Sequence, residues 1–202
     1  MSSIIRFGEH VKGYEVPVLN EREVRAAAGI MFTGAMVSFM NAFLIREYDL
    51  LKVFITAFLI DFAIRLFINP LYAPSMVLGR IAVQKQKAEY TGAPQKKFAW
   101  SIGLIMAVTM FILVVILENV GIFNLIMCIM CLTFLLFESA FGICIGCYLY
   151  SWLYKKPAKL CPGGACEIIR KEKIQQINSV QIIMTLGIII SLLVLFNYLK
   201  SV

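Results

Sequence analysis

The sequence predicts an all-α integral membrane protein, a bundle of about five transmembrane helices forming a single domain over residues 1–202. Sixty per cent of the residues are hydrophobic and only 15% are charged, whereas soluble domains are about half apolar and about a quarter charged. Such a chain has too few polar side chains to cover a water-facing surface. Apolar runs of about twenty residues recur along it, and an α-helix needs about that length to cross a bilayer.

Polar or helix-breaking residues bound the predicted spans. Asn20 followed by Glu23 is typical of a helix start with an acidic first turn, and Asn69 with Pro70 stops the second span. The fourth apolar stretch is either one span that projects beyond the membrane or two short ones, because its 35 residues would measure about 52 Å as a helix, against about 30 Å of hydrocarbon. We predict spans over residues 26–45, 50–68, 98–117, 120–143 and 179–199.

The distribution of Lys and Arg residues predicts the orientation. Five spans with a cytoplasmic N-terminus put 15 basic residues on the cytoplasmic side and three outside, in keeping with the positive-inside rule. A double crossing between Val120 and Tyr154 would instead expose a loop with six basic residues outside. The net charge of +7 then faces anionic lipid headgroups, and no nucleic-acid partner is expected.

The loop between the second and third spans is predicted to contain a short helix. Pro74 and Ser75 suit the first turn of a helix, and the following apolar positions line one side of it. We therefore expect an interfacial or re-entrant helix here. At the start of the third span, membrane-interface residues are expected to anchor the helix at the headgroups; these are Lys96, Lys97 and Trp100.

Four cysteines form the sharpest chemical signal, as one pair at Cys144 and Cys147 and a second at Cys161 and Cys166. On the predicted topology all four lie at the cytoplasmic membrane face, a reducing compartment in which stable structural disulfides are not expected. Cysteines grouped in such a place indicate redox turnover, sulfur handling or metal binding. The first pair falls on one helical face, within reach of a vicinal disulfide or two metal bonds.

Local sequence predicts a different role for each thiol. Cys166 follows a Pro-Gly-Gly turn at the start of an amphipathic helix, where the helix dipole and nearby lysines stabilise a thiolate, so it is the candidate nucleophile. Cys161 is then the resolving thiol or a sulfur relay partner. Cys144 and Cys147, interpreted as lying toward a helix C-terminus, would accept electrons or sulfur. Glu138, six residues before Cys144, is the predicted proton carrier.

The chemical alternative is a metal site. Thiol chemistry by these cysteines predicts no cofactor. The main alternative to thiol chemistry is a zinc ion or an iron–sulfur cluster held by all four paired cysteines. Cys128 and Cys131, which lie inside the fourth span, are interpreted as packing residues because free cysteine behaves as a small hydrophobe.

Ionisable residues inside predicted spans form the second signal. Asp61 and Arg65 have the i, i+4 spacing of an ion pair on one helical face, and Glu138 has no partner in its own helix. Charges at this depth are costly and point to function by default, although Asp61 with Arg65 would equally lock helices together. Glu138 is predicted either to serve the thiols or to pair with Arg65, whose depth is similar.

Five segments in order resemble the bacterial integral-membrane family called domain of unknown function 4395. The resemblance implies a multi-pass protein of the bacterial inner membrane, but it supplies no activity. It also draws attention to Arg65, Asn69, Arg80, Glu138 and the four paired cysteines. The segments are VPVLNEREVRAAAG (16–29), RLFINPLYAPSMVLGR (65–80), EYTGAPQKKFAW (89–100), FESAFGICIGC (137–147) and LCPGGAC (160–166).

The leading prediction is cytoplasm-facing thiol chemistry at the membrane, either disulfide exchange or transfer of a persulfide sulfur. Its predicted partners are the lipid bilayer and a thioredoxin-like or rhodanese-like protein or a quinone, with a homo-oligomer left open. The alternatives are a transporter or channel for an anionic sulfur species, in which Arg65 and Arg80 hold the anion, and a non-enzymatic scaffold with structural metal.

Overall fold

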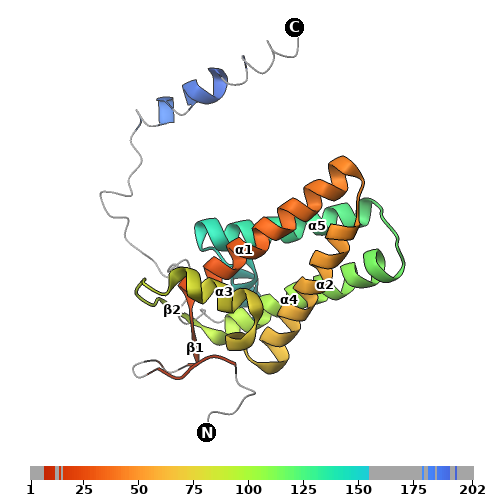
Figure 1. The fold of residues 1–202 in the computed structure, drawn as a ribbon. Coiled ribbons are helices and arrows are strands. Elements are labelled where there is room, and N and C mark those ends of the chain that lie inside the picture. Colours follow the sequence, from red (N-terminus) through yellow and green to blue (C-terminus); the bar gives the residue numbers. More distant parts are fainter. Residues whose placement is uncertain are drawn as a thin grey trace. The chain divides into compact units, whose positions relative to one another are not determined.

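The structure is a computed structural model, and it describes residues 7–11, 14, 16–154, 179, 182–184, 186–191 and 194. The chain divides into two compact units, Met1–Glu167 and Ile168–Val202. The described part of the first unit is built mainly of helices (Figure 1), so the predicted all-α class is confirmed. The single domain over residues 1–202 stays a prediction.

Helix α1 (Glu21–Met40) begins where the sequence predicts. The side chain of Asn20 accepts a hydrogen bond from the backbone N–H of Arg22 at 3.2 Å and donates one to Glu23 at 3.0 Å. These bonds satisfy groups that a helix start otherwise leaves open. The helix continues as a π-helical turn, η1 (Asn41–Ile45), and stops at Arg46, whose backbone is left-handed.

Helix α2 (Asp49–Ala63) runs into the π-helical turn η2 (Ile64–Ile68) and ends at Asn69, as predicted. Asn69 accepts a hydrogen bond from Leu71 at 3.0 Å and so starts the short 3₁₀ helix η3 (Pro70–Tyr72). Helix α3 (Pro74–Val83) follows with proline in its first turn. The short helix predicted between the second and third spans is therefore present.

Helix α3 lies directly against α1, and Gly79 makes the close approach possible. A Cβ atom at Gly79 would lie 2.7 Å from the carbonyl oxygen of Glu23 and 2.9 Å from the backbone nitrogen of Ala27. Ser75, Met76 and Gly79 are buried on this side of α3. The opposite face is apolar and exposed, at Val77, Leu78 and Ile81.

Replacing Gly79 by alanine should lower the free energy of unfolding by about 1–3 kcal/mol, because the added methyl group would overpack against the backbone of α1. Gly29 is the matched control. A Cβ there would meet only the side chain of Ser139 at 3.7 Å, an ordinary contact, so Gly29→Ala should leave α1 as stable or slightly more stable. Denaturant unfolding in detergent micelles measures both variants, and equal effects would contradict the close packing.

Two short strands, which the sequence did not predict, join the N-terminal segment to the loop before α4. Strand β1 (Val18–Asn20) pairs antiparallel with β2 (Tyr90–Gly92), with Val18 opposite Gly92 and Asn20 opposite Tyr90. The backbone N–H of Glu21 also donates to the carbonyl of Glu89 at 2.6 Å. The pairing holds the start of α1 beside the start of α4.

Helix α4 (Ala93–Met110) continues as the π-helical turn η4 (Phe111–Ile116). It begins five residues before the predicted boundary at residue 98, with Pro94 in its first turn. Proline suits that position because the first N–H groups of a helix have no intrahelical partner. Lys96 and Trp100 therefore lie on the first turns of α4.

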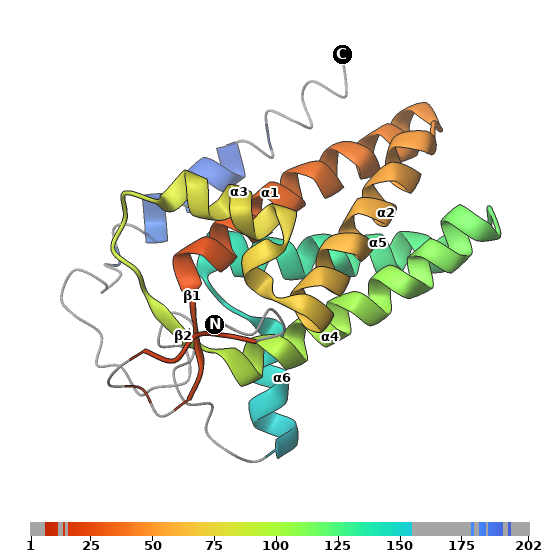
Figure 2. The same ribbon diagram turned by 60° about the horizontal axis from the view of Figure 1, so that its bottom comes forward.

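The long fourth apolar stretch forms two helices. Helix α5 (Ile122–Leu136) continues as the π-helical turn η5 (Phe137–Phe141), and the backbone of Gly142 then turns left-handed with φ of 66°. Helix α6 (Ile145–Tyr154) starts three residues later and leaves α5 in a new direction (Figure 2). The 20 residues Ile122–Phe141 are long and apolar enough for one crossing, so the stretch need not cross the membrane as one 35-residue helix.

Within the described residues, three helices are long and apolar enough to cross a membrane: Glu21–Ile45, Ala93–Ile116 and Ile122–Phe141. The helix of the second predicted span has a similar length, with 15 residues in α2 and 5 in η2. It is not one of these three because it carries the charged residues Lys52, Asp61 and Arg65. Of the last predicted span, the described residues 182–184 and 186–191 are helical. The number of five spans stays a prediction.

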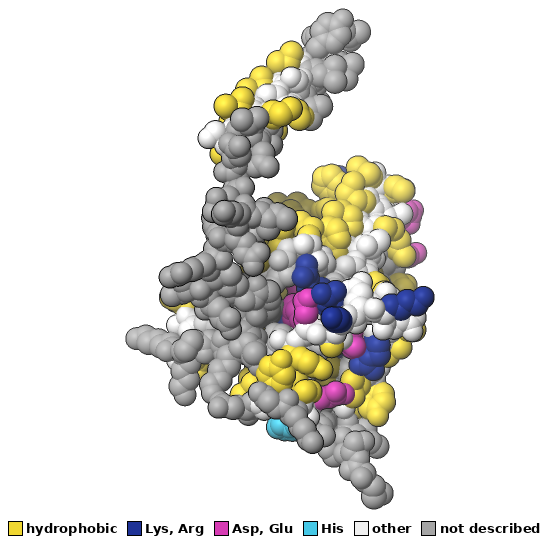
Figure 3. Space-filling view, turned by 90° about the vertical axis from the view of Figure 1, so that its left-hand side faces the viewer, with side chains coloured by type: hydrophobic (Ala, Val, Ile, Leu, Met, Phe, Trp, Pro, Cys, Tyr) yellow, Lys and Arg dark blue, Asp and Glu magenta, His cyan; other side chains and the backbone are white. Residues whose placement is uncertain are grey.

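The core of the first unit lies between α1, α2, α4 and α5. Alanines on α1 let the neighbouring helices approach, while Phe58 and Phe62 of α2 stack with ring centroids 4.3 Å apart. The outer surface of these helices is largely apolar. Figure 3 shows apolar side chains over one part of the surface and charged ones gathered in another, the distribution that helices embedded in lipid would need.

Candidate functional site

Cys144 and Cys147 are joined by a disulfide at the start of α6. Their Cα atoms lie 5.2 Å apart, within the range of ordinary disulfides. The backbone N–H of Cys147 donates to the carbonyl oxygen of Cys144 at 3.0 Å and to its Sγ atom at 3.3 Å. The structure thus brings together the first cysteine pair, as the spacing of the two residues predicted.

The predicted position of this pair at a helix C-terminus is wrong. Because Gly142 ends the preceding helix, Cys144 instead caps the N-terminus of α6. Unpaired N–H groups and the helix dipole stabilise a thiolate at that end of a helix. The favourable environment that the sequence suggested for Cys166 is therefore also provided at Cys144.

The disulfide faces an apolar cavity of about 290 Å³ between α2, α4, α5 and α6. The sulfur atom of Cys144, the free thiol of Cys131 and the carboxyl group of Glu138 lie in its wall. Cys144 is 6% exposed and Cys147 only 1%, so both sulfur atoms are screened by protein and Cys144 is the more accessible. The aromatic and thioether side chains of the wall are those of Phe58, Phe62, Trp100, Phe134, Met106, Met127 and Met130.

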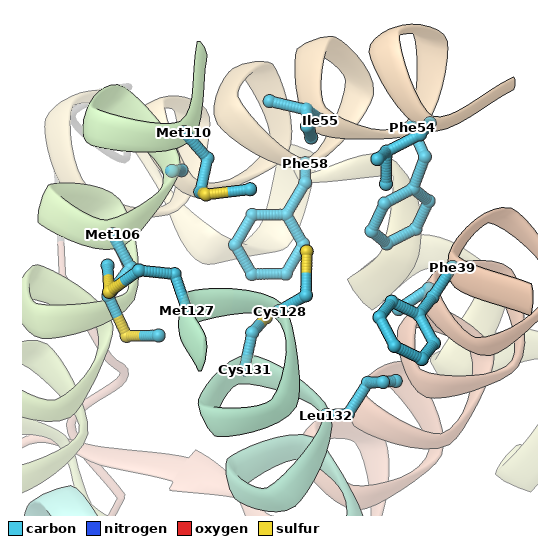
Figure 4. A pocket seen from close by; sticks show the side chains of 13 residues that line it. Phe39, Phe54, Ile55, Phe58, Met106, Met110, Met127, Cys128, Cys131 and Leu132 are labelled. Atoms are coloured by element: carbon cyan, nitrogen blue, oxygen red, sulfur yellow. The ribbon is translucent and has the colours of Figure 1, made fainter. Parts of the chain in front are cut away.

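Cys128 and Cys131 line a second, smaller cavity of about 50 Å³ between α1, α2, α4 and α5 (Figure 4). Both thiols are free. Their neighbours are aromatic, aliphatic and methionine side chains, among them Phe39, Phe58 and Met110. These surroundings agree with the interpretation of the two cysteines as small packing residues.

Glu138 forms an ion pair with Lys96, not with Arg65. The Nζ atom of Lys96 lies 2.6 Å from a carboxylate oxygen of Glu138 and 3.0 Å from one of Glu21. Lys96 is completely buried, which corrects the prediction that it anchors α4 at the headgroups. A buried ammonium group needs compensating charge, and this one draws it from α1 and η5 at once.

Asp61 and Arg65 form the ion pair that their spacing predicted. The Nε atom of Arg65 donates to Asp61 at 2.7 Å, and its Nη2 atom donates to the hydroxyl of Ser75 at 2.6 Å. Ser75 in turn donates its backbone N–H to Asp61 at 2.9 Å. The group ties α2 to the first turn of α3, as the locking interpretation requires.

Aromatic rings enclose the Arg65 guanidinium as well, since its carbon lies 4.7 Å from the ring centroid of Phe62 and 4.9 Å from that of Trp100. The residue is only 3% exposed. Its charge is thus already matched by a carboxylate and two rings, which weakens the case for Arg65 as an anion-binding residue of a transporter.

The other predicted binding residues also have structural partners. Arg80 donates to a carboxylate oxygen of Glu23 from Nε at 3.1 Å and from Nη2 at 3.0 Å, and so joins α3 to α1. Asn69 caps the turn after η2. The transport function for which Arg65 and Arg80 were singled out stays a prediction.

Cys161 and Cys166 lie outside the described residues. Among the residues that the structure does describe, no three His, Cys, Asp or Glu side chains are grouped as a metal site would need. The four-cysteine site for zinc or an iron–sulfur cluster includes this second pair. It therefore stays a prediction, as does the nucleophilic role of Cys166.

Sequence reasoning missed Lys96 and Glu21 as parts of the site, and took Trp100 only for an interface anchor. The sequence places Glu21 and Lys96 near the polar starts of two apolar helices. A charged side chain at such a position can be either buried in an ion pair or exposed to solvent, and the sequence does not distinguish the two. The β1–β2 pairing brings the two helix starts together, and Glu21 and Lys96 then form a buried ion pair.

Comparison with family models matches residues 19–155 to the family described as "Domain of unknown function (DUF4395)". The match covers every described helix of the first unit, from α1 to α6. No curated protein and no solved structure matches the chain.

Proposed function

The chain belongs to the DUF4395 family, whose description assigns no activity, and we propose that it carries out thiol–disulfide exchange at a membrane with Cys144 and Cys147 as the redox pair. The observation that carries the proposal is the bonded pair at the N-terminus of α6, in the wall of an apolar cavity. A disulfide that served only to staple the fold would not need an accessible cavity beside it.

Cys144 is the sulfur at which exchange takes place. It lines the cavity and is the more exposed of the two, and a thiolate there gains the N–H donors of the α6 N-terminus. An incoming thiolate attacks Sγ of Cys144, the Cys144–Cys147 bond breaks, and Cys147 leaves as the thiolate. A second thiol of the reductant then attacks the mixed disulfide and releases reduced Cys144.

Glu138 is positioned to handle the protons of this reaction. It shares the cavity wall with Cys144, and its contact with Lys96 fixes the carboxylate against α4. Each full exchange moves two electrons and two protons between the cysteine pair and its reactant, so a carboxyl group near the thiols is useful as a relay.

The proposal includes the location that the sequence predicts, the bacterial inner membrane with multiple crossings and a cytoplasmic N-terminus. The uneven distribution of basic residues supports this orientation. Cys161 and Cys166 would then form a second pair at the same membrane face that exchanges with Cys144 and Cys147. Their predicted soluble partner is a thioredoxin-like or rhodanese-like protein.

Differential alkylation of the purified protein in detergent tests the proposal. After equilibration in mixtures of reduced and oxidised dithiothreitol, two thiols should appear together at one redox ratio, and peptide mapping should assign them to Cys144 and Cys147. Cys147→Ser should trap a mixed disulfide through Cys144, whereas Cys144→Ser should reduce trapping at this site at least a hundredfold.

Cys128→Ser is the matched control, because Cys128 lies in the other cavity and forms no disulfide. It should leave the redox midpoint of the Cys144 pair unchanged. Thiols at Cys144 and Cys147 that stay reduced at every redox ratio, or equal trapping in the Cys144→Ser variant, would rule out exchange at this pair.

A further inference from the structure

The described part of the chain screens the disulfide from large reactants. Cys147 is 1% exposed and Cys144 6%, and the side of Cys144 that remains open faces the cavity between α2, α4, α5 and α6. A folded protein cannot insert a thiol into a cavity of about 290 Å³, but a small apolar molecule can enter it. A reactant that reaches Cys144 through this cavity must therefore be small.

We propose that this cavity binds a quinone, which oxidises the Cys144–Cys147 dithiol to the disulfide. This inference rests on the proposed exchange function and names its electron acceptor. The volume of about 290 Å³ lies just below the range of ligand pockets, roughly 300–1,000 Å³, which suits one or two fused rings. Two of the helices around it, α4 and α5, are long and apolar enough to cross a membrane, the phase in which quinones dissolve.

The cavity wall fits a flat ring. Aromatic faces stack on such rings, and thioether sulfur atoms make favourable contacts with ring edges. Phe62, Trp100 and Phe134 supply the first kind of surface. Met106, Met127 and Met130 supply the second.

The redox and polar groups of the wall distinguish a quinone from an ordinary lipid tail. A lipid tail needs no redox-active or charged group, yet the disulfide-bonded Cys144 and the carboxylate of Glu138 line this largely apolar cavity, together with the free thiol of Cys131. Reduction of a quinone takes up two electrons and two protons. Two S–H bonds break, one S–S bond forms, and the two carbonyl oxygens of the quinone become hydroxyl groups, so electrons and protons balance without another reactant.

Fluorescence of Trp100 reports binding directly. The chain contains two tryptophans, of which Trp152 is exposed and Trp100 is buried in the cavity wall. In a Trp152→Phe variant, decylubiquinone or a short-chain menaquinone analogue should quench the remaining emission saturably. A phospholipid with the same chain length should not, because it lacks a ring that accepts excitation energy.

A variant that fills the cavity tests whether quenching comes from this site. Ile102 lies in the cavity wall, while Ile105 on the same helix points out, with 66% of its surface exposed. On the Trp152→Phe background, Ile102→Phe should weaken quinone binding at least tenfold, and Ile105→Phe should leave it within twofold. Equal affinities in the two variants would overturn the inference, because the quinone would then bind elsewhere or only in the micelle.

Electron transfer is the second measurement. Under anaerobic conditions the reduced protein should convert one quinone to quinol for each disulfide formed, and Cys144→Ser should abolish this conversion. If the pair exchanges with dithiothreitol but quinone neither quenches Trp100 nor is reduced, the quinone inference fails and the exchange function stands. If the pair does not exchange with dithiothreitol either, both proposals fail.

Discussion

Replacing Lys96 by methionine should lower the free energy of unfolding by about 3–5 kcal/mol, because it removes the cation from a buried ion-pair group. Lys96 is completely buried, and its Nζ atom lies 2.6 Å from Glu138 and 3.0 Å from Glu21. Methionine retains most of the packing volume of lysine. The loss therefore comes from the buried carboxyl group of Glu21 and the partly buried one of Glu138, both left without their partner, and reversible unfolding in mixed SDS and detergent micelles measures it.

Lys97→Met is the matched control, since Lys97 is the next residue of α4 and its side chain is exposed. That change should cost less than about 1 kcal/mol, the range of exposed charges. Adding Glu21→Gln and Glu138→Gln to Lys96→Met should restore part of the lost stability, because no buried charge would then lack a partner. Equal effects of Lys96→Met and Lys97→Met would contradict the buried group.

Local sequence signals predicted the helix boundaries where one residue type decides the backbone. Asn20 caps α1, Asn69 ends the second helix and caps η3, and Pro74 starts α3. Each signal acts within three or four residues, through a side chain that bonds a neighbouring N–H group or through the fixed backbone of proline. Such features can be deduced without knowing what packs against the helix.

The contacts of the candidate site could not be deduced in this way. Lys96 and Glu138 are 42 positions apart, and their pairing depends on how α4 and η5 pack. The break at Gly142 was hidden by apolar residues on both sides of it. Glycine permits a left-handed backbone but does not require it, so the sequence alone left open whether the helix continued to Cys144 and beyond.

The pairing of Cys144 with Cys147 was easier to predict than the surroundings of the two residues. The CxxC spacing allowed a disulfide in any helix or turn, and the structure forms it. Whether the pair favours a thiolate depends on which end of a helix it occupies. This in turn depends on Gly142, so one unrecognised turn was enough to place Cys144 and Cys147 at the start of a helix instead of toward the end of one.

Removing the carboxylate of Asp61 should have the second large effect, a loss of about 3–5 kcal/mol in the free energy of unfolding. Asp61→Leu leaves the guanidinium of Arg65 buried at 3% exposure and removes the acceptor of the Ser75 N–H. The link between α2 and α3 should therefore loosen first. Proteolysis near residues 69–73 should become faster than in the unchanged protein.

A double-mutant cycle separates the ion pair from simple packing. Asp61→Leu with Arg65→Met should be more stable than the sum of the two single losses predicts, by roughly 1–3 kcal/mol, because neither buried charge is left alone. Asp49→Ala, an exposed carboxylate on the first turn of the same helix, should cost less than about 1 kcal/mol. Strictly additive losses for Asp61 and Arg65 would mean that their 2.7 Å contact contributes nothing to stability and that each side chain acts through packing alone.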